Sequence, residues 1–359
     1  MSVLLVVVIL VLLIVVHEFG HFLAAKLFGV KVIEFGVGYP PRALTFGTWG
    51  GTEYTLNWIP FGGFVRLWGD DDDGIRGKGT FIDAKHYKQA IILVAGVCGN
   101  IVAGWLLFAG AYHAGILHTI DIPAAGARLM ITDIVAGSPA DAAGLKEGDY
   151  LLDVNDAKGA HPDMAPEAIT EFLSDRGGQD ITLSYEHAGA KETAVVRPAH
   201  AVVPSEAQRP AIGVGLALVT AESVSWADAL VQAAKSTYNT LVLVVKGVLT
   251  LLGQALRGAP NLQEVTGPIG LVGAVGEAAQ NGMGYVLSLA AFISLNLAVI
   301  NLIPIPALDG GRLVVVVVES VLRRKAPRLA IQLLNTVGIA LIVLLMIAVT
   351  YQDIARLLV

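Results

Sequence analysis

Long apolar segments alternate with polar, glycine-rich segments along the chain. Residues 3–16 carry no polar side chain, and further largely apolar runs occupy residues 88–112, 285–303 and 329–349. A helix rises about 1.5 Å per residue, so roughly 20 residues cross the ~30 Å hydrocarbon core of a bilayer. The pattern therefore predicts four transmembrane helices joined by more polar segments, the first of them over residues 3–25.

Composition indicates a membrane protein that also carries soluble mass. Hydrophobic residues make up 55% and charged residues 15% of the 359-residue sequence, and mean hydropathy is +0.66. The net charge of −6 gives no indication of nucleic-acid binding. Cys98 is the single cysteine, which excludes a disulfide within this sequence and a cysteine-based zinc site.

The N-terminal apolar run could also be a cleaved signal peptide. No basic segment precedes it, and no small-residue cleavage pattern follows it. Instead the run continues through a few polar side chains into Phe22-Leu23-Ala24-Ala25. We therefore expect a retained transmembrane helix.

Three side chains at the end of this first run can bind a metal ion or transfer a proton: His17, Glu18 and His21. On a helix the two histidines lie one turn apart on the same face, so both imidazoles can bind one metal ion. Such groups are costly at membrane depth unless they face a protein interior and bind a ligand. Catalytic zinc usually takes three protein ligands and a water, and a neighbouring carboxylate such as Glu18 can take a proton from that water. The sequence must therefore supply a third ligand elsewhere.

The pattern divides the chain into eight segments. In chain order we expect the first transmembrane helix with the metal motif, a membrane-associated β-region on the cytoplasmic side, the second transmembrane helix, a soluble domain, a linker with an interfacial helix, the third transmembrane helix with its ligand loop, a cytoplasmic connection, and the fourth transmembrane helix with a C-terminal tail. Their ranges are 1–28, 29–87, 88–118, 119–203, 204–284, 285–311, 312–328 and 329–359.

The acidic run Asp70–Asp73 invites comparison with a calcium-binding loop. The ligand pattern of such a loop is absent, because Gly69 occupies the first ligand position and Thr80 the twelfth. We expect a solvated loop there.

Asn100 is the one strongly polar side chain within the second predicted helix, among small residues such as Gly96 and Gly99 that permit close helix packing. Its amide could make a packing hydrogen bond or face the metal cavity. We expect the packing hydrogen bond.

Residues 120–203 have the composition of a soluble domain. The run from Gly137 to Asp149 predicts a short helix with a Ser-Pro start, a glycine stop and a tight turn before a strand. This run resembles the signature of a PDZ domain, which implies a peptide ligand bound in extended form beside a strand and a helix. A structural spacer is the alternative.

The segment 222–258 is apolar enough to suggest another span. Lys235, Lys246 and Arg257 nevertheless recur within it at helical spacing. This pattern favours an amphipathic helix that lies in the membrane interface over a spanning one.

Basic residues set the expected orientation. By the positive-inside rule, the connections after the first and third helices belong on the cytoplasmic side. Their basic residues are Lys31, Arg42, Arg66, Arg76, Lys78, Lys85, Lys88, Arg312, Arg323, Arg324, Lys325 and Arg328. The soluble domain and both termini then face the opposite side. A fifth span at 240–256 would separate the two basic connections, so the charge pattern supports four spans.

The third predicted helix ends in the run NLIPIPALDGG, residues 301–311. Its two prolines and two glycines deform a helix, which is tolerated at membrane depth where the backbone lines a protein cavity. Asp309 is the carboxylate in this run, at the same cytoplasmic depth as His17 and His21. We therefore expect Asp309 to be the third metal ligand.

Two motifs carry a resemblance to a known family. HEFGH at residues 17–21 and NLIPIPALDGG at residues 301–311 resemble the signature motifs of the site-2 proteases, which are membrane-embedded zinc metalloproteases. The PDZ-like insertion and the run IPFGGFV at residues 59–65 resemble the bacterial branch of this family, the regulator-of-sigma-E proteases. That branch has two tandem PDZ domains, whereas this sequence has room for one.

The resemblance implies a role for each motif residue. It implies Zn²⁺ bound by His17, His21 and Asp309, with Glu18 as the catalytic acid/base. It also implies that the strands within 32–66 clamp an unwound substrate helix near the metal. The residues of the second motif that it implies in substrate binding are Asn301, Pro304 and Pro306.

The sequence thus predicts a polytopic α-helical membrane protein with four transmembrane helices, a membrane-associated β-region and one inserted PDZ domain. Its expected function is intramembrane zinc proteolysis of transmembrane segments, for example of anti-sigma factors or signal-peptide remnants. The expected partners are transmembrane protein or peptide substrates, the lipid bilayer and a peptide at the PDZ domain, with no nucleic acid. The expected location is the bacterial inner membrane, with the zinc site near the cytoplasmic side and the PDZ domain and both termini on the periplasmic side. A non-catalytic membrane-anchored PDZ scaffold and a metal-ion transporter stay open as alternatives.

Overall fold

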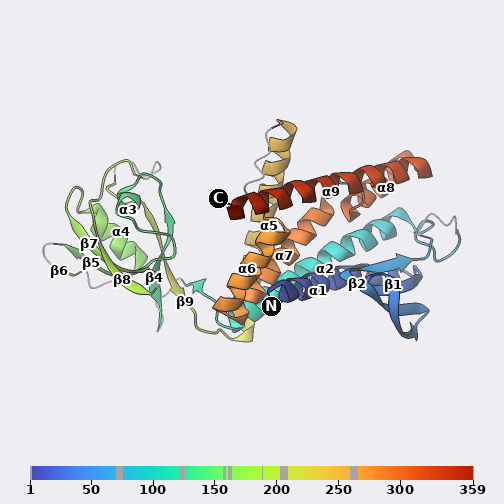
Figure 1. The fold of residues 1–359 in the computed structure, drawn as a ribbon, viewed down its shortest axis with the longest axis horizontal. Helices are drawn as coiled ribbons and strands as arrows, with labels where there is room; N and C mark the ends of the chain where they lie inside the picture. The colour runs from blue at the N-terminus through green and yellow to red at the C-terminus, as the bar shows by residue number, and fades with distance from the viewer. Residues whose placement is uncertain are drawn as a thin grey trace. The chain divides into compact units, whose positions relative to one another are not determined.

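The computed structural model describes residues 2–69, 76–120, 126–156, 159–160, 164–187, 189–202, 209–258 and 266–358 (Figure 1). The chain forms two compact units, which we name the helical unit (Met1–Ala114 and Val224–Val359) and the sheet unit (Gly115–Ser223). The acidic run Asp70–Asp73, for which we predicted a solvated loop, lies outside the described residues.

Among the described residues, the helical unit is built mainly of long helices. They are α1 (Ser2–Leu27), α2 (His86–His113), α5 (Trp226–Leu256), α6 (Pro268–Asn281), α7 (Met283–Leu302), α8 (Asp309–Leu322) and α9 (Arg328–Leu358). By length and composition, five of these described helices could cross a membrane: α1, α2, α5, α7 and α9. The chain is therefore a multi-pass membrane protein.

Helix α5 covers the segment that we predicted to be an interfacial amphipathic helix. Its most apolar window has a mean hydropathy of 1.3, against 2.0 to 3.0 for the other four candidate spans. Its N-terminal part packs on α2 and α7, where Ala229 and Ala233 are fully buried. Most of its other side chains are exposed or half-buried in the absence of a membrane.

Helices α1, α2 and α7 lie side by side and form the core of the helical unit (Figure 1). Glycines bring α1 and α2 together. A Cβ atom on Gly20 would lie 2.3 Å from the carbonyl oxygen of Ala95, and one on Gly99 would lie 3.0 Å from that of Val16. Small residues permit this approach between membrane helices, so the close packing predicted for the second helix is confirmed.

Residues 32–67 form a hairpin next to the C-terminal end of α1 (Figure 1). Strands β1 (Val32–Trp49) and β2 (Thr52–Leu67) lie within the segment 29–87 that we predicted to be a β-region. Register shifts let the strands continue past their prolines and glycines.

One part of the hairpin forms a free sheet edge. Residues 32–37 of β1 lie between two parts of β2, because they pair with residues 53–56 and also with residues 63–67. In the described pairing, residues 63–67 have a strand on one side only. An edge of this kind presents unpaired backbone groups that a further strand can join.

The outer half of the hairpin exposes large apolar side chains, which are Tyr39, Leu44, Phe46, Trp49, Trp58 and Ile59. Several large exposed apolar side chains on one element are typical of a membrane or protein interaction site. The position of the β-region against the membrane stays a prediction.

The sheet unit contains a seven-stranded sheet with the strand order β3-β9-β4-β5-β7-β8, in which β6 also pairs with β5. Its described elements are β3 (His118–Thr119), β4 (Arg128–Ile134), α3 (Pro139–Ala142), β5 (Tyr150–Asp156), β6 (Gly159–Ala160), α4 (Pro166–Ser174), β7 (Ile181–His187), β8 (Ala190–Val196) and β9 (Val214–Thr220). Leu129, Ile131, Val154, Ile169 and Ile181 are at the centre of its apolar core.

The signature run of this unit folds as its sequence predicts. Ser138 caps α3 by accepting a hydrogen bond from the Asp141 N–H, and Pro139 occupies the first helical turn. Gly144 ends the turn with a φ of 83° and Gly148 has a φ of 91° just before β5.

Strand β9 corrects the predicted boundary between the soluble domain and the linker. Its residues Val214–Thr220 lie in the segment 204–284, yet they pair with β4 and β3 inside the sheet. An apolar run this short cannot be assigned to a strand by periodicity alone, since a buried helical segment would look the same.

Candidate metal centre

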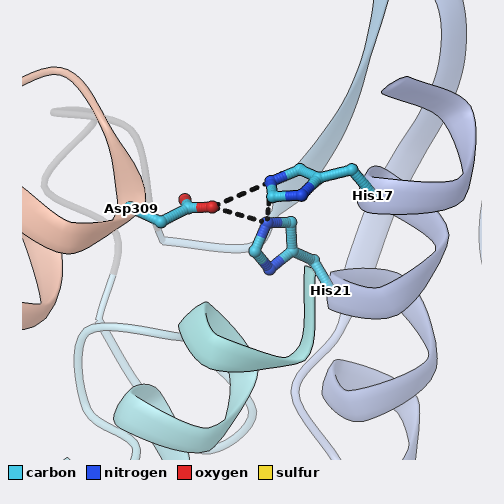
Figure 2. A group of neighbouring side chains, drawn as sticks. All are labelled: His17, His21 and Asp309. Atoms are coloured by element: carbon cyan, nitrogen blue, oxygen red, sulfur yellow. Dashed lines mark hydrogen bonds and ion pairs between the residues drawn. The ribbon is translucent and has the colours of Figure 1, made fainter. Parts of the chain in front are cut away.

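Three side chains from two distant parts of the chain meet near the C-terminal end of α1, as Figure 2 shows. His17 and His21 project from one face of α1, one helical turn apart, and Asp309 is the first residue of α8. The Nε2 atoms of the two histidines are 3.2 Å apart. Asp309 Oδ2 lies 2.9 Å from His17 Nε2 and 3.1 Å from His21 Nε2.

This triangle of atoms fits a zinc ion. Zinc–ligand bonds of about 2.0–2.1 Å in tetrahedral geometry place the ligand atoms roughly 3.3 Å apart. Two imidazole nitrogens and one carboxylate oxygen leave the fourth position for water, as in catalytic zinc sites. Within the described residues, His17, His21 and Asp309 are the one group of three His, Cys, Asp or Glu side chains whose ligand atoms lie close enough to hold a metal ion.

The three ligand candidates lie deep in the helical unit. His17 and His21 are 7% and 8% exposed, and the Asp309 side chain is 17% exposed. Buried polar groups are retained when they have partners. His21 has a second one, because its Nδ1–H donates to the carbonyl oxygen of Ile92 at 2.7 Å. That hydrogen bond leaves the Nε2 lone pair facing the other two ligand atoms.

Gly96 of α2 forms the wall behind both histidines. A Cβ atom at this position would lie 2.5 Å from His21 Nε2 and 2.8 Å from His17 Cε1. The sequence indicated Gly96 only as a packing glycine, and nothing in its pattern showed that it faces the metal ligands.

Asn100, one turn further along α2, also faces the site. Its Nδ2 atom lies 3.3 Å from His17 Nδ1, and the residue is fully buried. The predicted packing role was therefore wrong for the side chain. The packing hydrogen bond at this position goes to the backbone instead, where Ser294 Oγ donates to the Asn100 carbonyl oxygen at 2.8 Å.

A tight loop between α7 and α8 positions Asp309 beside the two histidines. Helix α7 ends at Leu302 and α8 begins at Asp309, so the two prolines lie outside both helices. A Cβ atom on Gly310 would lie 2.2 Å from the Ile303 carbonyl oxygen, and Ala307 adopts a φ of 75°. Such close turns need glycine or a left-handed residue. Helix α9 supports the loop, since its Gly338 packs directly on Pro306.

The predicted substrate-binding residues take different positions. Asn301 is near the ligand atoms, with Nδ2 3.4 Å from His17 Nε2. Pro304 is exposed. Pro306 lines a cavity of about 360 Å³ that also involves α8 and α9.

Glu18 is half-buried and connects the metal site to the β-hairpin. Its Oε2 atom accepts a hydrogen bond from the backbone N–H of Val65 at 3.0 Å. Val65 belongs to the edge segment 63–67 of β2. The carboxylate beside the histidine pair is thus held by the free strand edge, an arrangement that the sequence did not predict.

The arrangement can hydrolyse an amide bond. Three convergent ligands can hold a zinc ion with one open position, a carboxylate is adjacent in sequence to a ligand, and a strand edge is available for an extended peptide. These are the parts of a zinc metallopeptidase.

Comparison with known proteins places the chain in a family. The model of peptidase family M50 matches residues 5–345. A protein of Clostridium perfringens named as a zinc metalloprotease is 32% identical over 345 residues, which cover 95% of each chain. Similarly named proteins are 33% identical over 89% of each chain in Fusobacterium nucleatum, and 27% identical over 97% of this chain and 94% of the relative in Agrobacterium fabrum.

The chain therefore belongs to peptidase family M50, the site-2 protease family, as its two motifs predicted. It is an intramembrane metalloprotease with zinc as its cofactor. A solved structure, the PDZ domain of the SdrC-like protein from Listeria monocytogenes, matches 27% of this chain and 93% of that chain, with 16% identity and a TM-score of 0.21.

Proposed function

We propose that the chain cleaves transmembrane segments of membrane proteins at a zinc ion held by His17, His21 and Asp309, with Glu18 as general acid/base. The observation that carries the proposal is the convergence of the three ligand atoms, with separations of 2.9, 3.1 and 3.2 Å. When bound, zinc acidifies a water molecule and polarises the scissile carbonyl. Glu18 takes the proton of the attacking water and returns it to the leaving amine.

A transmembrane substrate arrives as a helix whose carbonyl groups are occupied by their own hydrogen bonds. It must unwind before its backbone can reach the site, and its freed backbone groups then need partners. The edge segment 63–67 of β2 supports this step, because it pairs with a described strand on one side only and lies beside Glu18, which accepts a hydrogen bond from the Val65 N–H. Asn301 supports it as well, since its amide lies beside His17 Nε2.

Removal of zinc is expected to abolish cleavage, and added zinc should restore it. The test uses the full chain in detergent with a transmembrane-helix peptide, 1,10-phenanthroline as chelator, and metal analysis of each sample. Asp309→Asn should lower both the zinc content and the cleavage rate, because an amide is a much weaker ligand than a carboxylate.

Glu319→Gln, on the same helix α8, is the matched control, because this carboxylate contacts the Ala326 N–H and not the metal site. Two results would refute the assignment of the ligands. One is full cleavage by the enzyme after the chelator has removed its zinc, and the other is an Asp309→Asn protein that binds as much zinc as the wild type.

Asn301→Ala is expected to raise the KM for the peptide by about fivefold, because the loss of one hydrogen bond to substrate costs about 1 kcal/mol. Asn296→Ala is its control. Asn296 lies on the same helix α7 and donates to the Phe292 carbonyl oxygen, one turn away on its own helix. An unchanged KM for Asn301→Ala would remove Asn301 from the substrate site.

We further propose four membrane spans, with α5 in the extracytoplasmic interface. His113 at the end of α2 stacks on Trp226 at the start of α5, with ring centroids 4.2 Å apart. Gly276 of α6 lies against Ser2 at the start of α1. Asp353 near the end of α9 accepts hydrogen bonds from the N–H groups of Gly267, Ile269 and Gly270.

These contacts support a return of the α5–α6 segment to the side on which it begins. The end of α2, the start of α1 and the end of α9 share one side in a four-span arrangement. Helix α6 has 14 residues, about 21 Å, which is too short to cross the bilayer core. A single crossing by α5 would leave the segment on the wrong side, so α5 is assigned to the interface.

The topology predicts that Arg257→Cys reacts with a membrane-impermeant thiol reagent added from outside. The experiment uses bacterial cells that have lost their outer membrane but keep a sealed inner membrane. The chain carries serine in place of Cys98, so that the introduced cysteine is the one that reacts. Arg324→Cys in the basic connection should stay protected until the membrane is opened. Protection of Arg257→Cys under the same conditions would establish α5 as a span. The same labelling pattern tests the inner-membrane location and the extracytoplasmic position of the sheet unit.

For the sheet unit itself we propose a PDZ-type role, in which it binds a peptide.

A further inference from the structure

Asn100 has a polar atom that the packing of α2 does not explain. The residue is 0% exposed, and its Oδ1 atom has no hydrogen-bond partner among the described residues. Its Nδ2 atom lies 3.3 Å from His17 Nδ1. Buried polar side chains without partners are rare in folded proteins and call for an explanation.

The proposed zinc site dictates what His17 Nδ1 needs. His17 Nε2 is the atom that faces the other two ligands, at 2.9 Å from Asp309 Oδ2 and 3.2 Å from His21 Nε2. A neutral imidazole that offers Nε2 to a metal carries its hydrogen on Nδ1. The partner of His17 Nδ1 must then be a hydrogen-bond acceptor.

Asn100 can supply that acceptor without any movement of α2. The oxygen and nitrogen of an asparagine amide have nearly the same size and exchange places by a half-turn of the terminal group. After this turn Oδ1 occupies the position 3.3 Å from His17 Nδ1. The buried oxygen gains a partner, and His17 gains an acceptor.

Helix α2 would then serve both histidines in the same way. The Ile92 carbonyl oxygen already accepts from His21 Nδ1–H at 2.7 Å. Ile92 and Asn100 are eight residues apart, about two turns of α2, and Gly96 lies between them against both rings. One helix face thus provides an acceptor, a flat wall and a second acceptor.

We propose that Asn100 is a positioning residue of the metal centre: its Oδ1 accepts a hydrogen bond from His17 Nδ1–H and so fixes the ring orientation and the tautomer in which Nε2 binds zinc. The inference rests on the proposed zinc ligands and extends them by a residue that touches neither metal nor substrate. Partners of this kind raise the basicity of a ligating histidine and hold its ring in place.

Asn100→Asp and Asn100→Leu separate the acceptor from the shape of the side chain. Aspartate keeps the shape and offers only acceptors, whereas leucine keeps the volume and offers none. The measurement is the zinc affinity of the full chain in detergent, from competition with a chromophoric chelator, together with the visible absorption of the Co²⁺-substituted protein. Asn100→Asp should bind zinc at least as tightly as the wild type. Asn100→Leu should lose about 10- to 100-fold in affinity and show an altered Co²⁺ spectrum.

Ser294→Ala is the matched control, because it removes a buried hydrogen bond to the Asn100 backbone and leaves the side chain at His17. It should keep wild-type zinc affinity. Folding of each variant is checked by its elution and thermal unfolding in detergent. If Asn100→Leu does not fold, Asn100→Ala replaces it with the same expected loss.

Two results would overturn the proposal. One is a folded Asn100→Asp protein with weakened zinc binding, which would show that His17 needs a donor or an uncharged amide. The other is a folded Asn100→Leu or Asn100→Ala protein with wild-type affinity and spectrum. A wild-type chain that binds no zinc would instead refute the proposed ligand set, so the two failures are distinguishable.

Discussion

Glu18→Gln is expected to lower the rate of peptide cleavage by about 10²- to 10⁴-fold, the contribution of a general acid/base, while the zinc content stays unchanged. Glutamine keeps the shape of the side chain and an oxygen that can accept from the Val65 N–H, which lies 3.0 Å from Glu18 Oε2. It cannot take up the proton of the attacking water. The measurement is the single-turnover cleavage of a transmembrane peptide, with zinc determined on the same sample.

Glu53→Gln is a suitable control for Glu18→Gln. Glu53 lies in the β-hairpin and pairs with Arg42 on its exposed side, so its replacement should leave cleavage within about twofold, as is usual for exposed ion pairs. Cleavage by zinc-loaded Glu18→Gln at the wild-type rate would show that another group moves the proton.

Gly96→Ala is expected to have the second large effect, a loss of at least tenfold in zinc affinity, comparable to the loss of a group that orients metal ligands. The added Cβ would lie 2.5 Å from His21 Nε2, well inside van der Waals contact. Either α2 or both histidine rings must move, and either movement opens the ligand triangle. Zinc affinity by chelator competition and cleavage rate should fall together.

Gly110→Ala is the matched control on the same helix. Its Cβ would meet only Leu287 Cδ1 at 3.4 Å, an ordinary contact with a flexible side chain. We expect unchanged zinc binding for this variant. A Gly96→Ala protein that folds and binds zinc like the wild type would mean that α2 does not form the wall of the site.

Spacing within one element made the two histidines predictable from the sequence. His17 and His21 are one turn apart on a helix, and this periodicity does not depend on the rest of the fold. Asp309 was predicted less directly. Its place at the end of the third predicted helix, together with the positive-inside rule, put it at the same depth in the membrane as the two histidines. The structure brings its Oδ2 atom within 3.1 Å of both Nε2 atoms.

Contacts between elements could not be predicted in the same way. Whether Gly96 and Asn100 face the histidines or another helix depends on the rotation of α2 about its axis, which an almost uniformly apolar helix does not reveal. The hydrogen bond from Val65 to Glu18 depends on the register of the hairpin, and bulges that no local signal marks set that register. Strand β9 likewise joins the sheet through long-range pairing.

The distance along the chain between the ligands has a consequence during synthesis. His17 and Asp309 are separated by 292 positions. At roughly 5–20 residues per second, a ribosome needs about 15–60 seconds to cover that interval. Throughout this time the nascent chain contains two of the three proposed ligands, His17 and His21, in an already translated first helix. With the proposed ligand set, peptidase activity therefore begins only after Asp309, which lies within the last 51 of the 359 residues, has been translated.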